Sequence, residues 1–379
     1  MINARYLLVP FSCLIVLVSC GGNGGQIEKM VEGGIEIVVN HLEPYKVGNR
    51  SAFALDELFV IDTEQDNISR LGIADIQGFE VNSQGEIFCL KALRGEGDFV
   101  YKFDISGTFV KSFGSRGEGP GELQQPNSIF LDGHGNIVVV NIGRYPLNIY
   151  DRNGSFISGN AMTRNAWKVT SGPRLSTLIL ESANNRVNGE YQFSLKLLSS
   201  GLSELAVLDT YRFRFEQEKI RALEPVFCWS ASSNEVFVFN EERDYDIQVY
   251  DYRGKIIRKI RKQYRNIPVT ESDKKELLNL IPQQMRSYTY FPKFYPPVRG
   301  IVAGEDGTLL VSTFEKGDRP GDFMFDIYDS AGAFVDRKSI NAIVRENRLW
   351  ARLTGDKLYC LREKASGFRE LVAYNLKQK

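Results

Sequence analysis

Six copies of one short pattern predict an all-β fold with the architecture of a six-bladed β-propeller. Each copy contains an apolar strand, a second strand ending in an aromatic residue and Asp, a Gly turn and a third strand. The copies recur about every 40 to 70 residues, which is the spacing of four-stranded propeller blades. Strands rich in Val, Ile, Phe and Tyr, bounded by Gly, Asn and Asp, indicate β-structure throughout.

The copies can be placed along the chain from these turns and strands. They cover residues 85–113, 135–157, 177–201, 235–260, 309–335 and 358–374. The sixth copy lacks a clear outer strand, and either Ile35–Val39 or Leu58–Ile61 could supply it. Such a strand would join the two ends of the chain and close the ring, because a blade cannot bury both of its faces alone.

The longest connection between copies lies between the fourth and fifth, at residues 261–297, and we call it the insertion. It predicts a short helix over Glu271–Ile281, with Thr270 as its N-cap and Pro282 directly after its last residue. We therefore expect an all-β propeller with a short helical and aromatic insertion between blades 4 and 5.

The N-terminus predicts a lipoprotein signal peptide over residues 1–19. Tyr6–Val18 is mostly apolar but too short to span a bilayer, and Leu17-Val18-Ser19-Cys20 matches the lipobox. The alternative is an ordinary signal peptide in which Cys20 is incidental. Lipidation is favoured because Cys20 stands at the boundary and the flexible run Gly21-Gly22-Asn23-Gly24-Gly25 follows it.

These features predict the organisation and location of the protein. Residues 20–32 hold the lipidated cysteine and a tether, and residues 33–379 form a single propeller domain. The membrane is the predicted partner of Cys20, at the bacterial cell envelope and on either face of the outer membrane. Lys and Arg total 47 and Asp and Glu total 47, so no overall basic field favours a nucleic-acid partner.

The remaining cysteines predict neither a disulfide framework nor a zinc site. Cys89, Cys228 and Cys360 are odd in number and lack CxxC spacing. Cys89 and Cys360 occupy the same place in two repeats, where other repeats carry Val, so we expect small core side chains. No cofactor is expected.

The segment Ser112–Leu123, followed by Pro126, carries a resemblance to known families. It reads Ser-Phe-Gly-Ser-Arg-Gly-Glu-Gly-Pro-Gly-Glu-Leu after a strand, Asp and Gly turn. This run resembles NHL-repeat propellers, and more closely the six-bladed β-propeller lipoproteins of Gram-negative bacteria. The resemblance covers residues 75–157 well and 225–376 loosely. It implies the fold but says almost nothing about an activity.

In propellers of this type the first strand of each blade lines the central channel. Counting eight residues back from each turn gives the channel positions Gln77, Asn127, Lys168, Val226, Arg299 and Arg348. Arg116 and Arg144 should lie on the same rim. Three of the six channel positions are cationic and none is acidic, which would suit an anionic ligand such as a carboxylate, phosphate or acidic sugar. The alternative is that these cations pair with Glu80, Glu118 or Glu122, or that the strand register is shifted by one residue, which would turn the side chains to the other face.

The insertion also predicts a binding surface over the channel mouth. Its aromatic side chains are Tyr288, Tyr290, Phe291, Phe294 and Tyr295. They could form a lid that contacts a ligand, a glycan or an envelope protein. The alternative is that these rings pack the helix onto the propeller.

No arrangement of residues predicts catalysis. The two histidines, His41 and His134, lie before the ring and in a turn on the opposite face, so a Ser-His-Asp triad lacks a base. A basic channel is the wrong sign for a divalent cation. We therefore expect a non-catalytic ligand- or protein-binding lipoprotein. The alternative is a propeller hydrolase or lyase acting on a small anionic or glycan-derived substrate.

Overall fold

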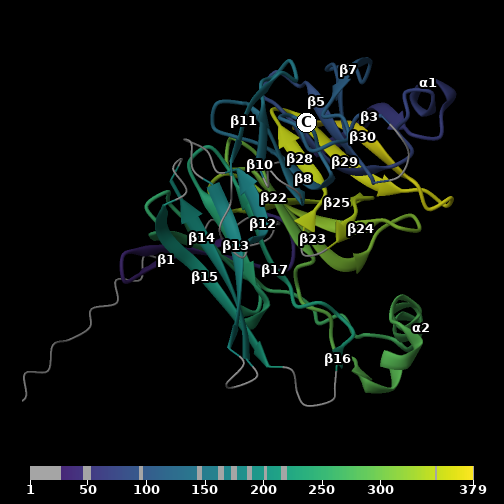
Figure 1. Ribbon diagram of the computed structural model, residues 1–379. Helices are drawn as coiled ribbons and strands as arrows, with labels where there is room; N and C mark the ends of the chain where they lie inside the picture. The colour runs from purple at the N-terminus through teal and green to yellow at the C-terminus, as the bar shows by residue number, and fades with distance from the viewer. Residues whose placement is uncertain are drawn as a thin grey trace, which may run out of the picture.

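Six blades of four strands make up the computed structural model (Figure 1). It describes residues 27–45, 53–93, 97–142, 147–160, 166–171, 177–185, 190–199, 203–214, 220–345 and 348–378. The predicted signal peptide and Cys20 lie outside the described residues. Within each blade, neighbouring strands are antiparallel, so each blade is a meander from an inner to an outer strand. The chain is a six-bladed β-propeller, as the repeats predict.

The first three blades follow the predicted repeats. Blade 1 contains β4 (Ile76–Val81), β5 (Ile87–Lys91), β6 (Val100–Phe103) and β7 (Phe109–Phe113). Blade 2 contains β8 (Gln125–Leu131), β9 (Ile137–Ile142), β10 (Leu147–Tyr150) and β11 (Phe156–Asn160). Blade 3 contains β12 (Ala166–Ser171), β13 (Thr177–Asn185), β14 (Glu190–Leu198) and β15 (Glu204–Arg214).

The last three blades differ in how they end. Blade 4 contains β17 (Phe227–Ala231), β18 (Val236–Asn240), β19 (Asp246–Tyr250) and β20 (Ile256–Lys262). Blade 5 contains β22 (Gly300–Ala303), β23 (Leu309–Lys316), β24 (Phe323–Tyr328) and β25 (Phe334–Ile340). Blade 6 contains β28 (Ala351–Thr354), β29 (Lys357–Glu363), β30 (Arg369–Gln378) and the early strand β3 (Phe53–Asp62).

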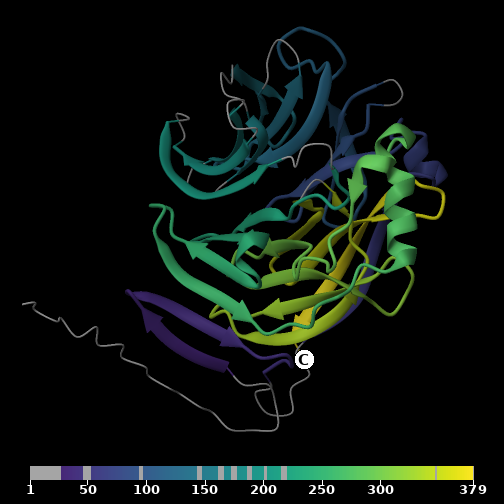
Figure 2. The same ribbon diagram turned by 90° about the horizontal axis from the view of Figure 1, so that it is seen from below.

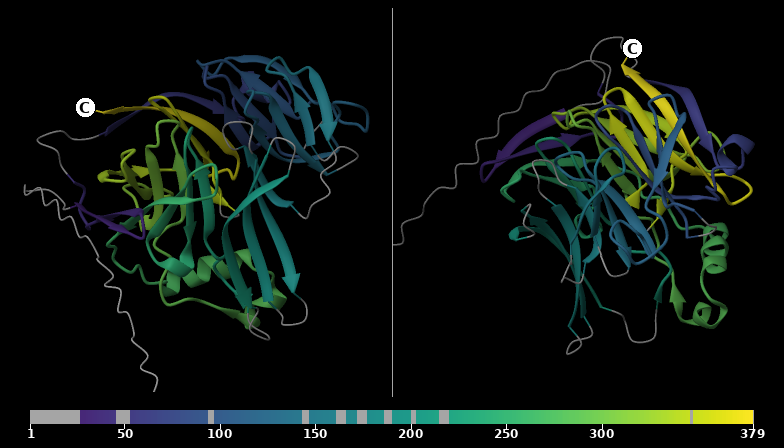
Figure 3. Two further views of the ribbon diagram at one scale, coloured as in Figure 1. Left: turned by 90° about the vertical axis from the view of Figure 1, so that its left-hand side faces the viewer. Right: turned by 45° about the horizontal axis from the view of Figure 1, so that its top comes forward.

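Strand β3 closes the ring. It pairs antiparallel with β30, with Ile61 opposite Leu371, so an early strand and the last strand of the chain share blade 6 (Figure 3). Of the two segments considered for this strand, Leu58–Ile61 is therefore correct. Ile35–Val39 lies elsewhere, in β2 (Ile35–Asn40).

The N-terminal hairpin extends blade 4. β1 (Ile27–Glu32) pairs with β2, and β2 runs parallel to β20 at the outer edge of the blade (Figure 2). Asn40 is buried at the junction with blade 5, where its Nδ2 donates to the Gly332 carbonyl (3.0 Å) and its Oδ1 accepts from the Phe334 amide (2.8 Å). These bonds hold the hairpin against two blades at once.

The hydrophobic core is divided among the interfaces between neighbouring blades. One cluster, for example, joins Phe79 and Tyr101 of blade 1 to Tyr359 and Leu371 of blade 6. Similar clusters join the other neighbours around the ring. Cys89, Cys228 and Cys360 are buried in these clusters, and burial raises the pKa of the Cys89 and Cys360 thiols. They are core side chains, as predicted.

The recurring Asp-x-x-Gly turns explain the sequence motif. At Gly154 φ is +79°, and a Cβ atom would lie 2.4 Å from Cδ1 of Phe113 in blade 1. At Gly107 φ is also +79°, and a Cβ atom would lie 2.5 Å from Cδ2 of Phe59 on β3. Glycine is required at both turns by the backbone conformation and by the approach of the preceding blade.

Short elements connect the blades, namely α1 (Asp66–Ser69), β16 (Ile220–Arg221), β26 (Val344–Arg345) and β27 (Arg348–Leu349). Another short element, η1 (Glu241–Arg243), joins β18 to β19 within blade 4. The insertion contains α2 (Glu271–Leu280), η2 (Gln283–Tyr288) and β21 (Thr289–Tyr290). Thr270 and Asp273 cap α2 reciprocally, in a capping box. No helix in the described part of the chain is long and apolar enough to cross a membrane.

Candidate functional site

Three of the six predicted channel positions lie within the inner strands of their blades, and the other three lie shortly before them. Gln77 is in β4 and Asn127 is in β8, and the Gln77 amide donates to the Asn127 carbonyl (3.3 Å). Val226 is buried directly before β17. Lys168 is in β12, but its side chain is not among the described parts of the structure. Arg144 lies outside the described residues.

Arg348 is paired with a carboxylate inside the protein. Its Nη2 lies 3.2 Å from Glu80 Oε1, its Nη1 donates to Ser128 Oγ (3.1 Å), and its guanidinium stacks 4.1 Å from the Trp350 ring centroid. Glu80 is buried in β4, three residues beyond Gln77, and also pairs with Arg352. The six channel positions contain no acidic residue, but Glu80 on the same inner strand supplies the counter-ion that the alternative interpretation had named.

Arg299 forms no ion pair with a carboxylate of the described residues. Its guanidinium lies 3.7 Å from the Phe323 ring centroid, and Nη1 donates to the Ala342 carbonyl (3.4 Å). Burial lowers the pKa of Arg299 to about 10. Arg299 and Arg348 thus have different surroundings, and the structure shows no contact that brings them together.

Arg116 and its neighbouring glutamates belong to a self-contained loop. The Arg116 side chain is exposed, 5.5 Å from the Phe99 ring centroid. Glu118 accepts from Gln124 Nε2 (2.9 Å), and Glu122 accepts from the Gly119 amide (2.8 Å). These two carboxylates therefore stabilise the glycine-rich loop, and neither has a recorded ion pair with a predicted channel cation.

The insertion is packed loosely and exposes large apolar side chains. No residue of α2 or η2 is buried. The exposed apolar residues are Leu280 (82%), Met285 (39%), Tyr288 (53%), Tyr290 (38%) and Phe294 (37%). We call these five residues the apolar patch. Residues 281–297 also contain Arg286 and Lys293 and no acidic residue.

Two predicted lid aromatics have other positions. Tyr295 stacks on Phe314 of β23, with ring centroids 4.6 Å apart, and burial raises the pKa of Tyr295 to about 12 beside Asp273 of α2. This ring packs the helix onto blade 5, as the alternative interpretation proposed. Phe291 is half-buried, whereas Tyr288, Tyr290 and Phe294 remain exposed.

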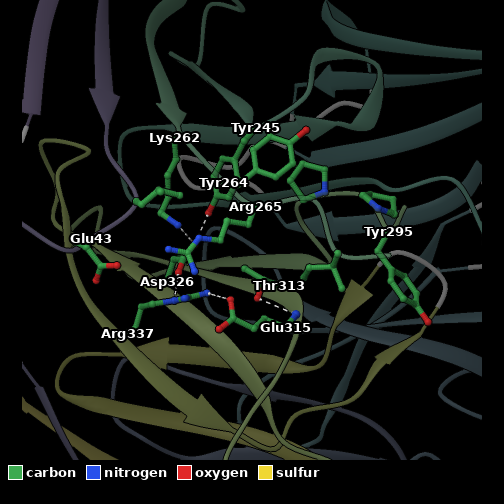
Figure 4. Close-up of a pocket in the computed structure, with 14 residues that line it drawn as sticks. Glu43, Tyr245, Lys262, Tyr264, Arg265, Tyr295, Thr313, Glu315, Asp326 and Arg337 are labelled. Carbon is green, nitrogen blue, oxygen red and sulfur yellow. Dashed lines mark hydrogen bonds and ion pairs between the residues drawn. The ribbon is translucent and has the colours of Figure 1, made fainter. Parts of the chain in front are cut away.

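A pocket that the sequence analysis missed lies between blades 4 and 5, and we call it the inter-blade pocket (Figure 4). Its volume is about 100 Å³. Its walls come from the end of the insertion, the segments after β2 and β20, and strands β23 to β25. The lining residues are Leu42, Glu43, Tyr245, Lys262, Tyr264, Arg265, Ile267, Tyr295, Pro296, Pro297, Thr313, Glu315, Asp326 and Arg337.

Asp326 organises the floor of the inter-blade pocket. It is completely buried and accepts from Lys262 Nζ (3.1 Å) and from the Tyr245 hydroxyl (2.9 Å). Arg337 Nε lies 2.8 Å from Asp326 Oδ1, and Arg337 Nη2 pairs with Glu315 (2.8 Å). Burial lowers the pKa of Lys262 although Asp326 opposes this shift. In Figure 4 the Lys262 and Arg337 side chains point toward Asp326.

Comparisons with known proteins support the fold. Residues 56–171 match a family described as a 6-bladed beta-propeller. A protein of Bacteroides fragilis described as exported is 14% identical, with 90% of this chain and 99% of that chain covered and a TM-score of 0.53. No curated protein matches the chain. At this identity the likeness concerns the fold alone.

Two enzymes are also similar, at lower scores. A gluconolactonase of Xanthomonas campestris is 12% identical, with 87% and 99% of the two chains covered and a TM-score of 0.43. Virginiamycin B lyase of Staphylococcus aureus is 11% identical, with 86% and 100% covered and a TM-score of 0.38. Neither likeness assigns an activity to this chain.

Proposed function

We propose that this protein is a non-catalytic, protein-binding β-propeller lipoprotein of the bacterial cell envelope, and that the insertion is its binding surface. The observation that carries the proposal is the apolar patch on a segment with no buried helical residue. A folded protein gains little stability from such side chains, whereas several large apolar groups exposed on one short segment are typical of interaction sites.

The composition of the insertion favours a protein partner. Tyr, Phe, Met and Arg are enriched at the centres of protein interfaces, and the insertion carries all four among its exposed residues. Leu280 and Met285 are aliphatic and suit an apolar protein surface better than a sugar. Arg286 and Lys293, without a nearby acid in residues 281–297, complement a partner surface with exposed carboxylates.

Photo-cross-linking tests this proposal directly. A photoreactive residue at Tyr288 should form one specific protein adduct in envelope preparations, and the same residue at the exposed Val110 of β7 should form none. Added purified protein should compete for the adduct, and a Tyr288→Ala/Phe294→Ala variant should compete at least about ten-fold less well. Equal competition by both proteins, or an adduct with glycan alone, would contradict the proposal.

The envelope location rests on Cys20 and has its own test. Cys20→Ala should release the protein from the membrane fraction or block its maturation, because the acyl chains would be lost. Fractionation and the mass of the mature chain measure both effects. Normal maturation with unchanged membrane association would show that Cys20 carries no anchor.

A further inference from the structure

We infer that the inter-blade pocket binds a small zwitterion that carries both a carboxylate and an ammonium group. This inference concerns a different site from the apolar patch and does not depend on the function proposed for it. It rests on three properties of the pocket, namely the charges at its rim, the fixed position of those charges and its size.

The rim of the pocket carries one cation and one anion that form no ion pair with the described residues. Arg265 and Glu43 both line the pocket and are exposed. Neither side chain forms a hydrogen bond or an ion pair with the residues that the structure describes. The other charges of the pocket are already matched, since Lys262 and Arg337 contact Asp326, and Arg337 also contacts the exposed Glu315. The rim charges are therefore those available to a ligand.

The whole pocket is electrically balanced. Its cations are Lys262, Arg265 and Arg337, and its anions are Glu43, Glu315 and Asp326. A simple anion or cation would pair with one rim group and leave the other without a partner. A ligand with one charge of each sign preserves the balance and can pair with both rim groups.

The segment that carries Glu43 is held in place on both sides. Asn40 bonds to Gly332 and Phe334 of blade 5, and its carbonyl accepts from the Gln263 amide (2.9 Å). After Glu43, the Tyr45 amide donates to the Phe334 carbonyl (2.7 Å). Because the carboxylate is carried by a fixed segment, less conformational entropy is lost when a ligand binds. Figure 4 shows Glu43 and Arg265 among the side chains around the pocket.

The volume limits the ligand to a small molecule. Drug-sized ligands occupy pockets of roughly 300 to 1,000 Å³, whereas the inter-blade pocket has about 100 Å³. Since one water takes up roughly 30 Å³, the enclosed space holds on the order of three non-hydrogen atoms, and the rest of a ligand would extend toward solvent. Glycine and alanine are small enough to bind in this way, and they carry both charges.

Calorimetric titration of the full chain in detergent solution tests the inference. Glycine, alanine and β-alanine are the probes, and acetate and methylammonium supply each charged half alone. We expect the amino acids to bind at least about ten-fold more tightly than either half, because only they pair with both rim groups. Arg265→Gln and Glu43→Gln should each weaken amino-acid binding by about ten-fold or more.

Arg253→Gln is the matched control for these variants. Arg253 is exposed in the turn between β19 and β20 and does not line the pocket, so its replacement should leave binding unchanged. Both rim residues are exposed, and thermal unfolding verifies that each variant is folded. The inference is wrong if no amino acid binds the unchanged protein. It is also wrong if acetate binds as tightly as glycine and Glu43→Gln has no effect, which would indicate a simple anion site.

Discussion

The interface between blades 1 and 6 and the insertion between blades 4 and 5 use their side chains in opposite ways. At the interface, the buried Glu80 is matched by Arg348 and Arg352 from the other blade or the segment leading to it. In the insertion, Leu280 and Tyr288 are exposed and contribute no buried core. The difference separates residues that hold the ring together from residues available to a partner.

The largest loss of stability is expected at Glu80. Glu80 is buried, and Glu80→Gln removes the negative charge that pairs with Arg348 and Arg352. Breaking a buried pair costs about 3 to 5 kcal/mol, and we expect about 2 to 4 kcal/mol because both arginines keep some solvent contact. Denaturant unfolding measures this loss.

Glu118→Gln is the control for Glu80. Glu118 is exposed and accepts one bond from Gln124, so its replacement should change the unfolding free energy by no more than about 0.5 kcal/mol. Similar effects at Glu80 and Glu118 would show that the inner ion pairs do not support the interface.

A smaller effect should distinguish two glycine turns. Gly154 and Gly135 have nearly the same positive φ, +79° and +78°, but a Cβ atom at Gly135 would meet nothing within 4 Å. Alanine at Gly154 would also press on Phe113 across the blade interface. Gly154→Ala should therefore cost about 1 to 3 kcal/mol more than Gly135→Ala in denaturant unfolding. Equal losses of stability for the two substitutions would show that glycine is required at these turns by the backbone conformation alone.

The local patterns in the sequence were sufficient to predict the blades. An Asp-x-x-Gly turn determines its own conformation, and the strands beside it have neighbours nearby in the chain. Helix α2 could also be predicted, because Thr270 and Pro282 mark its ends locally. The choice between Ile35–Val39 and Leu58–Ile61 was left open, since both are short apolar strands and the partner strand is distant in sequence.

The candidate sites depend on contacts that local patterns do not show. Arg348 and Arg352 are separated from Glu80 by 268 and 272 residues, so only the folded ring brings them together. The one available signal was that Glu80 lies on the same predicted inner strand as Gln77. The inter-blade pocket gave no such signal, because Glu43, Arg265 and Asp326 come from three distant segments.

The contribution of the apolar patch to folding should be the smallest of all. Tyr288→Ser/Phe294→Ser replaces two exposed rings, and we expect the unfolding free energy to change by no more than about 0.5 kcal/mol. Tyr295→Ser should lower the unfolding free energy by more, because the Tyr295 ring stacks on Phe314 and joins the insertion to blade 5.

Measuring stability and binding together on the same Tyr288→Ser/Phe294→Ser protein tests the central claim most directly. The account predicts unchanged unfolding in denaturant and at least about a ten-fold loss in competition for the adduct formed at position 288. The opposite result, a clear loss of stability with undiminished competition, would show that these rings support the fold and that the insertion is not the binding surface.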